Sequence, residues 1–168
     1  MNLKDLDPNI KEKWDYYLAE LNSMGRTKDT YGIIHGDLHN QNLIYDEGDL
    51  TFIDFGDSEN GWFAYDIAIS IYHASQSIKE TEERGKFANL FCQSFVDGYS
   101  KVNPVNEIIN KIDYFINFRH LYSYVYHNQY LDTANLNKKQ LDYLEEMKRT
   151  LIYQNSYFGI SLVSQEGI

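Results

Sequence analysis

Two short segments of the 168-residue chain concentrate polar residues of the types that carry chemistry. The first is HGDLHNQN at residues 35–42, and the second is IDFGD at residues 53–57. Phosphoryl transfer needs a carboxylate that orients the attacking hydroxyl and accepts its proton, together with oxygen ligands that hold magnesium on the phosphates. Carboxylate and amide oxygens suit magnesium better than cysteine or several histidines do. The residue types therefore indicate phosphoryl-transfer chemistry.

A predicted β-hairpin explains the spacing between these segments. Two β-prone runs, residues 42–45 and 50–53, flank the turn-forming sequence Asp-Glu-Gly-Asp. If the central Glu-Gly pair forms a two-residue loop, Asn42 and Asp54 come together at the open end of the hairpin. Asp37 lies on the loop before the first strand. The three residues are then expected to form one site, with Asn42 and Asp54 as the candidate metal ligands.

Each of these polar residues also has a purely structural explanation. Asp37 and Asp54 are of a type that caps backbone amides in loops, and Asn42 is also compatible with a simple strand start. His35 is expected to be a hydrogen-bonded scaffold residue, because the base in phosphoryl transfer can be a carboxylate. His39 either reaches the transferred phosphate or stabilises the loop.

Helical periodicity surrounds the two polar segments. Asp7-Pro8 is typical of a helix start, and the apolar residues that follow predict a helix over residues 8–21. Apolar spacing predicts four further helices, over residues 65–77, 80–99, 105–131 and 137–157. No repeat or interdomain linker is evident. We expect an α+β fold that is mainly α-helical, with residues 1–168 forming a single domain.

Composition excludes several classes of partner. The formal net charge of −10 repels nucleic acid and anionic membranes and favours cationic ligands, although solubility alone also explains it. No apolar run approaches the roughly 20 residues of a membrane-spanning helix, and the polar N-terminus does not resemble a signal peptide. The single cysteine, Cys92, cannot form an internal disulfide. We expect a cytoplasmic protein with no nucleic-acid or membrane partner.

The polar segments also carry a family resemblance. HGDLHxxN followed by the DFG of residues 54–56 resembles the catalytic loop and metal-binding motif of the protein-kinase fold. The glycine after the first histidine, and the histidine after the leucine, resemble the aminoglycoside phosphotransferase and choline kinase-like family. A third element of that family, a tryptophan-and-aspartate segment, is similar to WFAYDIA at residues 62–68. The motifs together cover about residues 33–68.

The resemblance implies a role for each matching position. It implies Asp37 as the catalytic base, with Asn42 and Asp54 as ligands of Mg²⁺ bound together with ATP or GTP. It implies that Asp66 lies beneath the catalytic loop and accepts hydrogen bonds from its backbone, since a buried carboxylate must be satisfied. The implied fold is the C-terminal lobe of the kinase-like fold, with a short β-hairpin at the metal site.

The implied function is transfer of a γ-phosphate to a hydroxyl of a small molecule, of an aminoglycoside-, choline- or homoserine-like kind. An aromatic run within residues 105–131 offers cation–π faces for a cationic substrate. Core packing is the alternative, and it is favoured for the phenylalanines. The run comprises Tyr114, Phe115, Phe118, Tyr122, Tyr124, Tyr126 and Tyr130.

The same resemblance raises the question of a second lobe. The N-terminal lobe of such enzymes supplies a glycine-rich loop and a lysine that hold the nucleotide. No G-x-G-x-x-G occurs in this sequence, so we expect that lobe to be absent and a separate N-terminal lobe or a second copy to complete the cleft. One alternative is a lone lobe that acts as a binding or regulatory module. Another is a metal-dependent hydrolase with His35, Asp37 and His39 as transition-metal ligands.

Overall fold

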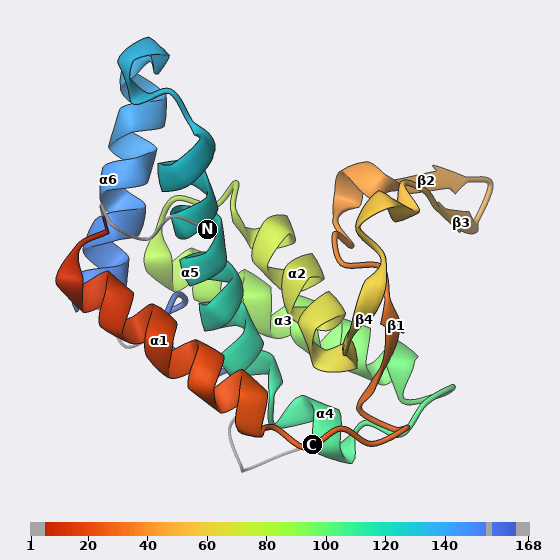
Figure 1. Cartoon of the computed structure of the whole chain (residues 1–168). Helices are drawn as coiled ribbons and strands as arrows, with labels where there is room; N and C mark the ends of the chain where they lie inside the picture. The colour runs from red at the N-terminus through yellow and green to blue at the C-terminus, as the bar shows by residue number, and fades with distance from the viewer. Residues whose placement is uncertain (1–5, 154–155, 164–168) are drawn as a thin grey trace. The chain divides into compact units, whose positions relative to one another are not determined.

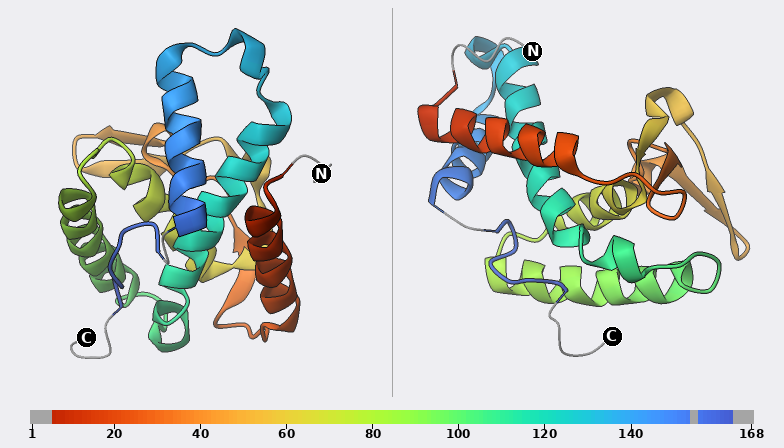
Figure 2. Two further views of the ribbon diagram at one scale, coloured as in Figure 1. Left: turned by 90° about the vertical axis from the view of Figure 1, so that its left-hand side faces the viewer. Right: turned by 60° about the horizontal axis from the view of Figure 1, so that its bottom comes forward.

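The computed structural model describes residues 6–153 and 156–163, and Figures 1 and 2 trace the chain. Backbone contacts divide the chain into two compact units. The first, which we call the helical unit, comprises residues 1–25 and 117–157; the second, the mixed unit, comprises residues 26–116 and 158–168. The single domain expected for residues 1–168 stays a prediction.

The helical unit is built from three helices, of which α1 spans Pro8–Ser23, α5 spans Ile112–Tyr130 and α6 spans Lys138–Tyr153. Only the part of α5 from residue 117 onward belongs to this unit. A short 3-10 helix, η3, at Thr133–Asn135 precedes α6. One apolar cluster holds the three helices together, and its buried members are Ile10, Trp14, Leu121, Tyr124, Val125, Met147 and Leu151.

The start of α1 confirms the capping prediction. The Asp7 side chain accepts a hydrogen bond from the backbone N–H of Asn9 at 3.0 Å, and Pro8 occupies the first helical position. Helix α6 begins close to its predicted start and ends at Tyr153, four residues before its predicted end. Its apolar face is buried only in the second half: Met147 is buried, whereas Leu141 near the start is exposed.

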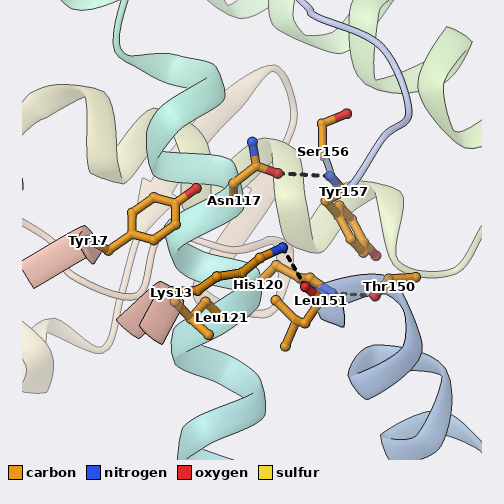
Figure 3. Close-up of a pocket in the computed structure, with 9 residues that line it drawn as sticks. All are labelled: Lys13, Tyr17, Asn117, His120, Leu121, Thr150, Leu151, Ser156 and Tyr157. Carbon is orange, nitrogen blue, oxygen red and sulfur yellow. Dashed lines mark hydrogen bonds between the residues drawn. The ribbon is translucent and has the colours of Figure 1, made fainter. Parts of the chain in front are cut away.

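A cavity of about 30 Å³ lies where the three helices of the helical unit meet (Figure 3). Its volume has room for about one or two water molecules. The Lys13 ammonium donates to the carbonyl of Leu151 at 2.5 Å, at the C-terminal end of α6. Thr150 donates its hydroxyl hydrogen to the carbonyl of Met147, so its oxygen accepts from His120 Nε2 at 2.8 Å. These hydrogen bonds connect the helices around the cavity.

The mixed unit contains two small antiparallel sheets and three helices. Strand β1, Tyr31–Ile34, pairs with β4, Glu59–Trp62, and β2, Leu43–Asp46, pairs with β3, Asp49–Phe52. Short 3-10 helices, η1 at Asn40–Asn42 and η2 at Phe55–Asp57, lie between strands. The helices are α2, Phe63–Ser75; α3, Thr81–Tyr99; and α4, Asn106–Ile109. Helix α2 packs against α3 and against the β1–β4 sheet, as Figure 1 shows.

The β2–β3 pair confirms the predicted hairpin and its register. Asp46 lies opposite Asp49, with Glu47 and Gly48 as the loop. Both loop residues have positive φ, 47° and 102°, as the tight two-residue turns that suit twisted strands require. Figure 1 shows the hairpin projecting from the rest of the mixed unit.

Two features differ from the sequence analysis. The helix predicted over residues 105–131 is divided into α4 and α5 by a turn at Asn110-Lys111, where polar residues interrupt the apolar spacing. The β1–β4 pairing was not predicted, because β4 contains Asn60 and Gly61, which disfavour strands when read alone. Over the described residues, every helix is too short or too polar to cross a membrane.

Candidate active site

Asp66, in the first turn of α2, ties the loop of residues 35–42 to that helix. Its carboxylate accepts hydrogen bonds from the backbone N–H of His35 at 2.6 Å and of Gly36 at 2.9 Å. Burial raises the pKa of Asp66, and the two N–H donors act in the opposite direction. Hydrogen bonds from the loop therefore offset part of the cost of half-burying the Asp66 carboxylate, and the same bonds hold the loop in place.

His35 connects this loop to the second polar segment. Its ring is buried, and Nε2 donates to the carbonyl of Ile53 at 2.9 Å. The N–H of Ile53 in turn donates to the carbonyl of Asn42 at 3.0 Å. Because Ile53 is held on both sides, the next residue, Asp54, is brought close to Asn42. His35 thus makes the contacts of a scaffold residue.

Asn42 and His39 both hold Asp37. The amide nitrogen of Asn42 donates to the backbone carbonyl of Asp37 at 2.9 Å. His39 Nδ1 accepts from the N–H of Gln41 at 3.2 Å, so the ring carries its hydrogen on Nε2, which lies 3.0 Å from Asp37 Oδ2. Because the nitrogen of Asn42 is engaged, its Oδ1 is the atom that suits a metal ion. His39 contacts the loop itself, as the loop-stabilising alternative predicts.

Asp54 has an unusual backbone. Its φ of 61° and ψ of 63° lie in the left-handed region, which costs most L-residues about 1–2 kcal/mol. Aspartate tolerates this region better than most residues do. Its side chain is exposed and makes no capping hydrogen bond to η2, which it precedes. Asp54 therefore does not cap the backbone amides of η2, the 3-10 helix that follows it.

Gly36 allows the two polar segments to touch. Its φ is +81°, and a Cβ at this position would overlap the carbonyl oxygen of Asp57. The backbone of the loop can approach the second segment this closely only without a side chain. Glycine at position 36 therefore sets the distance between the two polar segments.

Two further α2 residues contact the loop and were missed by the sequence analysis. The Ser70 hydroxyl donates to the carbonyl of Leu38 at 2.8 Å, and the His73 ring lies 5.2 Å from the His39 ring. Both follow Asp66 at helical spacing, four and seven residues on. That spacing was visible in the sequence, but it does not reveal what this face of the helix contacts.

The aromatic run divides according to burial. Phe115, Phe118 and Tyr124 are buried, as the packing alternative predicts for the phenylalanines. Tyr126 and Tyr130 are exposed, and their rings lie 4.7 Å apart near the end of α5. Tyr114 and Tyr122 are half-buried, so Tyr126 and Tyr130 are the most exposed members of the run.

The residues proposed for the hydrolase alternative do not form a metal site. Within residues 6–153 and 156–163, no three His, Cys, Asp or Glu side chains gather as a metal-binding group. His35 and His39 instead use their ring nitrogens within the loop and its neighbours. The oxygen set of Asn42 and Asp54 remains as the candidate for a hard cation such as Mg²⁺.

The Asp66 contacts predict a difference in stability between two aspartates of the site. Asp66→Ala should lower the free energy of unfolding by about 1–3 kcal/mol for each loop amide left unpaired. Asp37→Ala should lower it less, because the hydrogen bonds from Asn42 and His39 to the Asp37 carboxylate lie within the loop itself. Chemical denaturation of both variants beside the parent measures the effect. Equal midpoints for Asp66→Ala and the parent would show that the anchor is unimportant.

The crowding at Gly36 predicts an order among three glycine variants. Gly36→Ala combines a positive φ with an overlap, whereas Gly48→Ala has the positive φ with open space around it. Gly98→Ala has neither problem and lies within α3, where alanine stabilises by about 0.5–1 kcal/mol. Melting temperatures should therefore fall most for Gly36→Ala, less for Gly48→Ala, and not at all for Gly98→Ala. A Gly36→Ala melting temperature equal to that of Gly48→Ala would contradict the close approach to Asp57.

Comparison with known proteins agrees with this geometry. A sequence profile described as the phosphotransferase enzyme family matches residues 2–105. Amicoumacin kinase of Bacillus subtilis is 27% identical over 144 residues, which cover 84% of this chain and 43% of that protein. Homoserine kinase of Neisseria meningitidis serogroup B is 33% identical over 76 residues, which cover 45% of this chain and 23% of that protein.

A solved structure is similar over most of the chain. It is the amicoumacin kinase hAmiN in complex with AMP-PNP, Ca²⁺ and Ami, with a TM-score of 0.80 and 25% identity. The match covers 92% of this chain and 48% of that one, so the chain spans under half the length of these relatives. The fold is kinase-like, mostly helical with small sheets. Since the family profile matches more than half of its residues, the chain belongs to the phosphotransferase enzyme family.

Proposed function

We propose that this chain supplies the catalytic base and the metal ligands of an ATP-dependent phosphotransferase, in which it forms the C-terminal lobe. The reaction is transfer of the γ-phosphate to a hydroxyl of a small molecule. The observation that carries the proposal is the double hydrogen bonding of Ile53, to Asn42 and to His35, which brings Asp54 to the loop that holds Asp37. GTP is the alternative phosphate donor.

Asp37 is the base in this proposal. Its carboxylate orients the hydroxyl of the acceptor and takes up its proton as the phosphoryl group is transferred. His39, by donating to Oδ2, holds the carboxylate in one orientation. Positioning of this kind contributes a large part of the rate in phosphoryl transfer, because there is little covalent chemistry for the protein to perform.

Asn42 and Asp54 would hold Mg²⁺ together with the nucleotide phosphates. Asn42 offers Oδ1, and Asp54 offers an exposed carboxylate. Two protein oxygens do not fill the octahedral shell of Mg²⁺, which normally takes its other ligands from phosphates and water. When bound, the ion neutralises charge on the phosphates. The solved structure of amicoumacin kinase in complex with AMP-PNP, Ca²⁺ and Ami supports a nucleotide and a divalent cation.

The acceptor is a small hydroxyl compound that carries a cationic group. The names of the relatives, kinases of amicoumacin and of homoserine, support a small acceptor. The net charge of −10 supports a cation.

An N-terminal lobe or a second copy completes the nucleotide site. The sequence contains no glycine-rich phosphate loop, and phosphates held on one side only are held weakly. Exposed apolar side chains on both faces of the hairpin and beside it support a covering partner, because exposed apolar surface often marks interaction sites. These exposed residues are Ile33, Ile44, Leu50, Phe52 and Phe55. The lone-lobe binding module is the alternative that the same exposed side chains permit.

Activity should depend on the completing lobe. The 168-residue chain alone should release ADP from ATP at a negligible rate, and the N-terminal lobe of a related small-molecule kinase, fused or added in trans, should restore transfer. Asp37→Asn should abolish the restored activity, because the amide cannot accept the proton. A coupled ADP-release assay on a chain of proven monomeric state measures both. Strong Asp37-dependent turnover by the isolated monomer would contradict the need for a partner, and restored activity that survives Asp37→Asn would contradict the assigned base.

Metal binding should require the nucleotide. Titration calorimetry should detect Mg²⁺ or Mn²⁺ binding in the presence of ATP and little binding without it, since the phosphates supply part of the ligand shell. Asp54→Asn should weaken this binding. Asp57→Asn is the matched control, because Asp57 is an exposed carboxylate three residues along. Micromolar zinc binding without nucleotide would instead support the hydrolase alternative, and equal effects of the two variants would remove Asp54 as a ligand.

A further inference from the structure

One face of α2 contacts the polar loop at three successive places. Asp66 accepts from the amides of His35 and Gly36, Ser70 donates to the carbonyl of Leu38, and His73 packs against His39. Residues four and seven positions apart on a helix share a face, so the helix and the loop run alongside each other. Only the first of these three contacts is implied by the family resemblance.

The Ser70 hydroxyl is directed to the loop as well as to its own helix. A serine within a helix commonly donates to the carbonyl four residues earlier, and Ser70 lies 3.1 Å from that carbonyl, of Asp66. The loop carbonyl of Leu38 is nearer, at 2.8 Å. Ser75 shows the ordinary case: it is fully buried, and its hydroxyl donates to Ile71 of the same helix at 2.7 Å.

The His73 ring lies against the ring that contacts Asp37. Its Nδ1 donates to Oε1 of Gln76 at 3.2 Å, which orients the ring at the end of α2. The His39 ring, 5.2 Å away, has its Nδ1 occupied by the N–H of Gln41 and directs Nε2–H toward Asp37 Oδ2. The packing of His73 therefore limits how far the His39 ring can rotate away from Asp37.

We propose that Ser70 and His73 are positioning residues for Asp37. Ser70 fixes the backbone between Asp37 and His39, and His73 fixes the ring of His39, so that Nε2–H stays on the carboxylate. The role of Ser70 and His73 as positioning residues rests on the proposed function of Asp37 as the base. Their contacts with the loop are independent of that function, and they can be tested without nucleotide, metal or turnover.

The test uses nuclear magnetic resonance of the whole chain at about pH 8.5, where histidines are normally neutral. The nitrogen spectrum of His39 should show one tautomer, with hydrogen on Nε2. His73→Ala should give a mixture of both tautomers, and His73→Phe, which keeps a ring against His39, should restore the single form. A single Nε2–H tautomer in His73→Ala would overturn the role of His73.

Amide hydrogen exchange tests Ser70 in the same samples. Ser70→Ala should speed exchange at His39 and Asn42, whose N–H groups bond within the loop, by about fivefold. If the alanine variant does not fold, Ser70→Cys replaces it. Cysteine keeps a side chain of similar volume but is only a weak hydrogen-bond donor, so it should also speed exchange at these two amides. The control Ser75→Ala removes a buried helix serine without touching the loop and should leave these two rates unchanged. Equal acceleration in Ser70→Ala and Ser75→Ala, or none in either, would overturn the proposal.

Absence of phosphotransfer would overturn the proposed function and would leave the tautomer and exchange measurements unchanged.

Discussion

The carboxylate of Asp66 is the contact on which the site depends. It joins α2 to the two residues that follow β1, and the hydrogen bonds from His35 to Ile53 and from Ile53 to Asn42 extend the connection to the hairpin. Burial opposes the charge of Asp66 and raises its pKa, and the loop amides offset part of this effect. The loop and the carboxylate therefore stabilise each other, because either alone would leave polar groups without partners.

The parts of this arrangement that are local in sequence were predictable. The hairpin register follows from a turn at Glu47-Gly48, where glycine readily adopts the positive φ that a two-residue turn requires, and the start of α1 follows from Asp7-Pro8. The hydrogen bond from Ile53, the residue before Asp54, to Asn42 then follows from the register. The family motif adds the Asp66 contact, which no local rule contains.

The parts that depend on distant contacts were not predictable. Strand β4 contains Asn60 and Gly61, and it forms a strand because β1 provides the pairing. Glycine at position 61 leaves room for the Ile34 side chain, which a Cβ there would overlap. The contacts of Ser70 and His73 need the position of the loop, which helical spacing does not give. The turn between α4 and α5 falls within residues 105–131, where the sequence pattern predicts one continuous helix.

The left-handed backbone of Asp54 narrows the amino acids that this position can accept. Glycine adopts such angles without cost, and asparagine and aspartate adopt them more readily than other residues do. Glycine offers no side-chain oxygen and asparagine offers no charge, so aspartate alone combines this chain geometry with the charged oxygen that the proposed divalent cation needs. A β-branched residue at position 54 would destabilise the folded chain, because its side chain clashes with the backbone in the left-handed region, whatever its effect on chemistry. Substitutions found by random mutagenesis at this position should therefore be few, and selection for folding alone should already favour asparagine, aspartate and glycine.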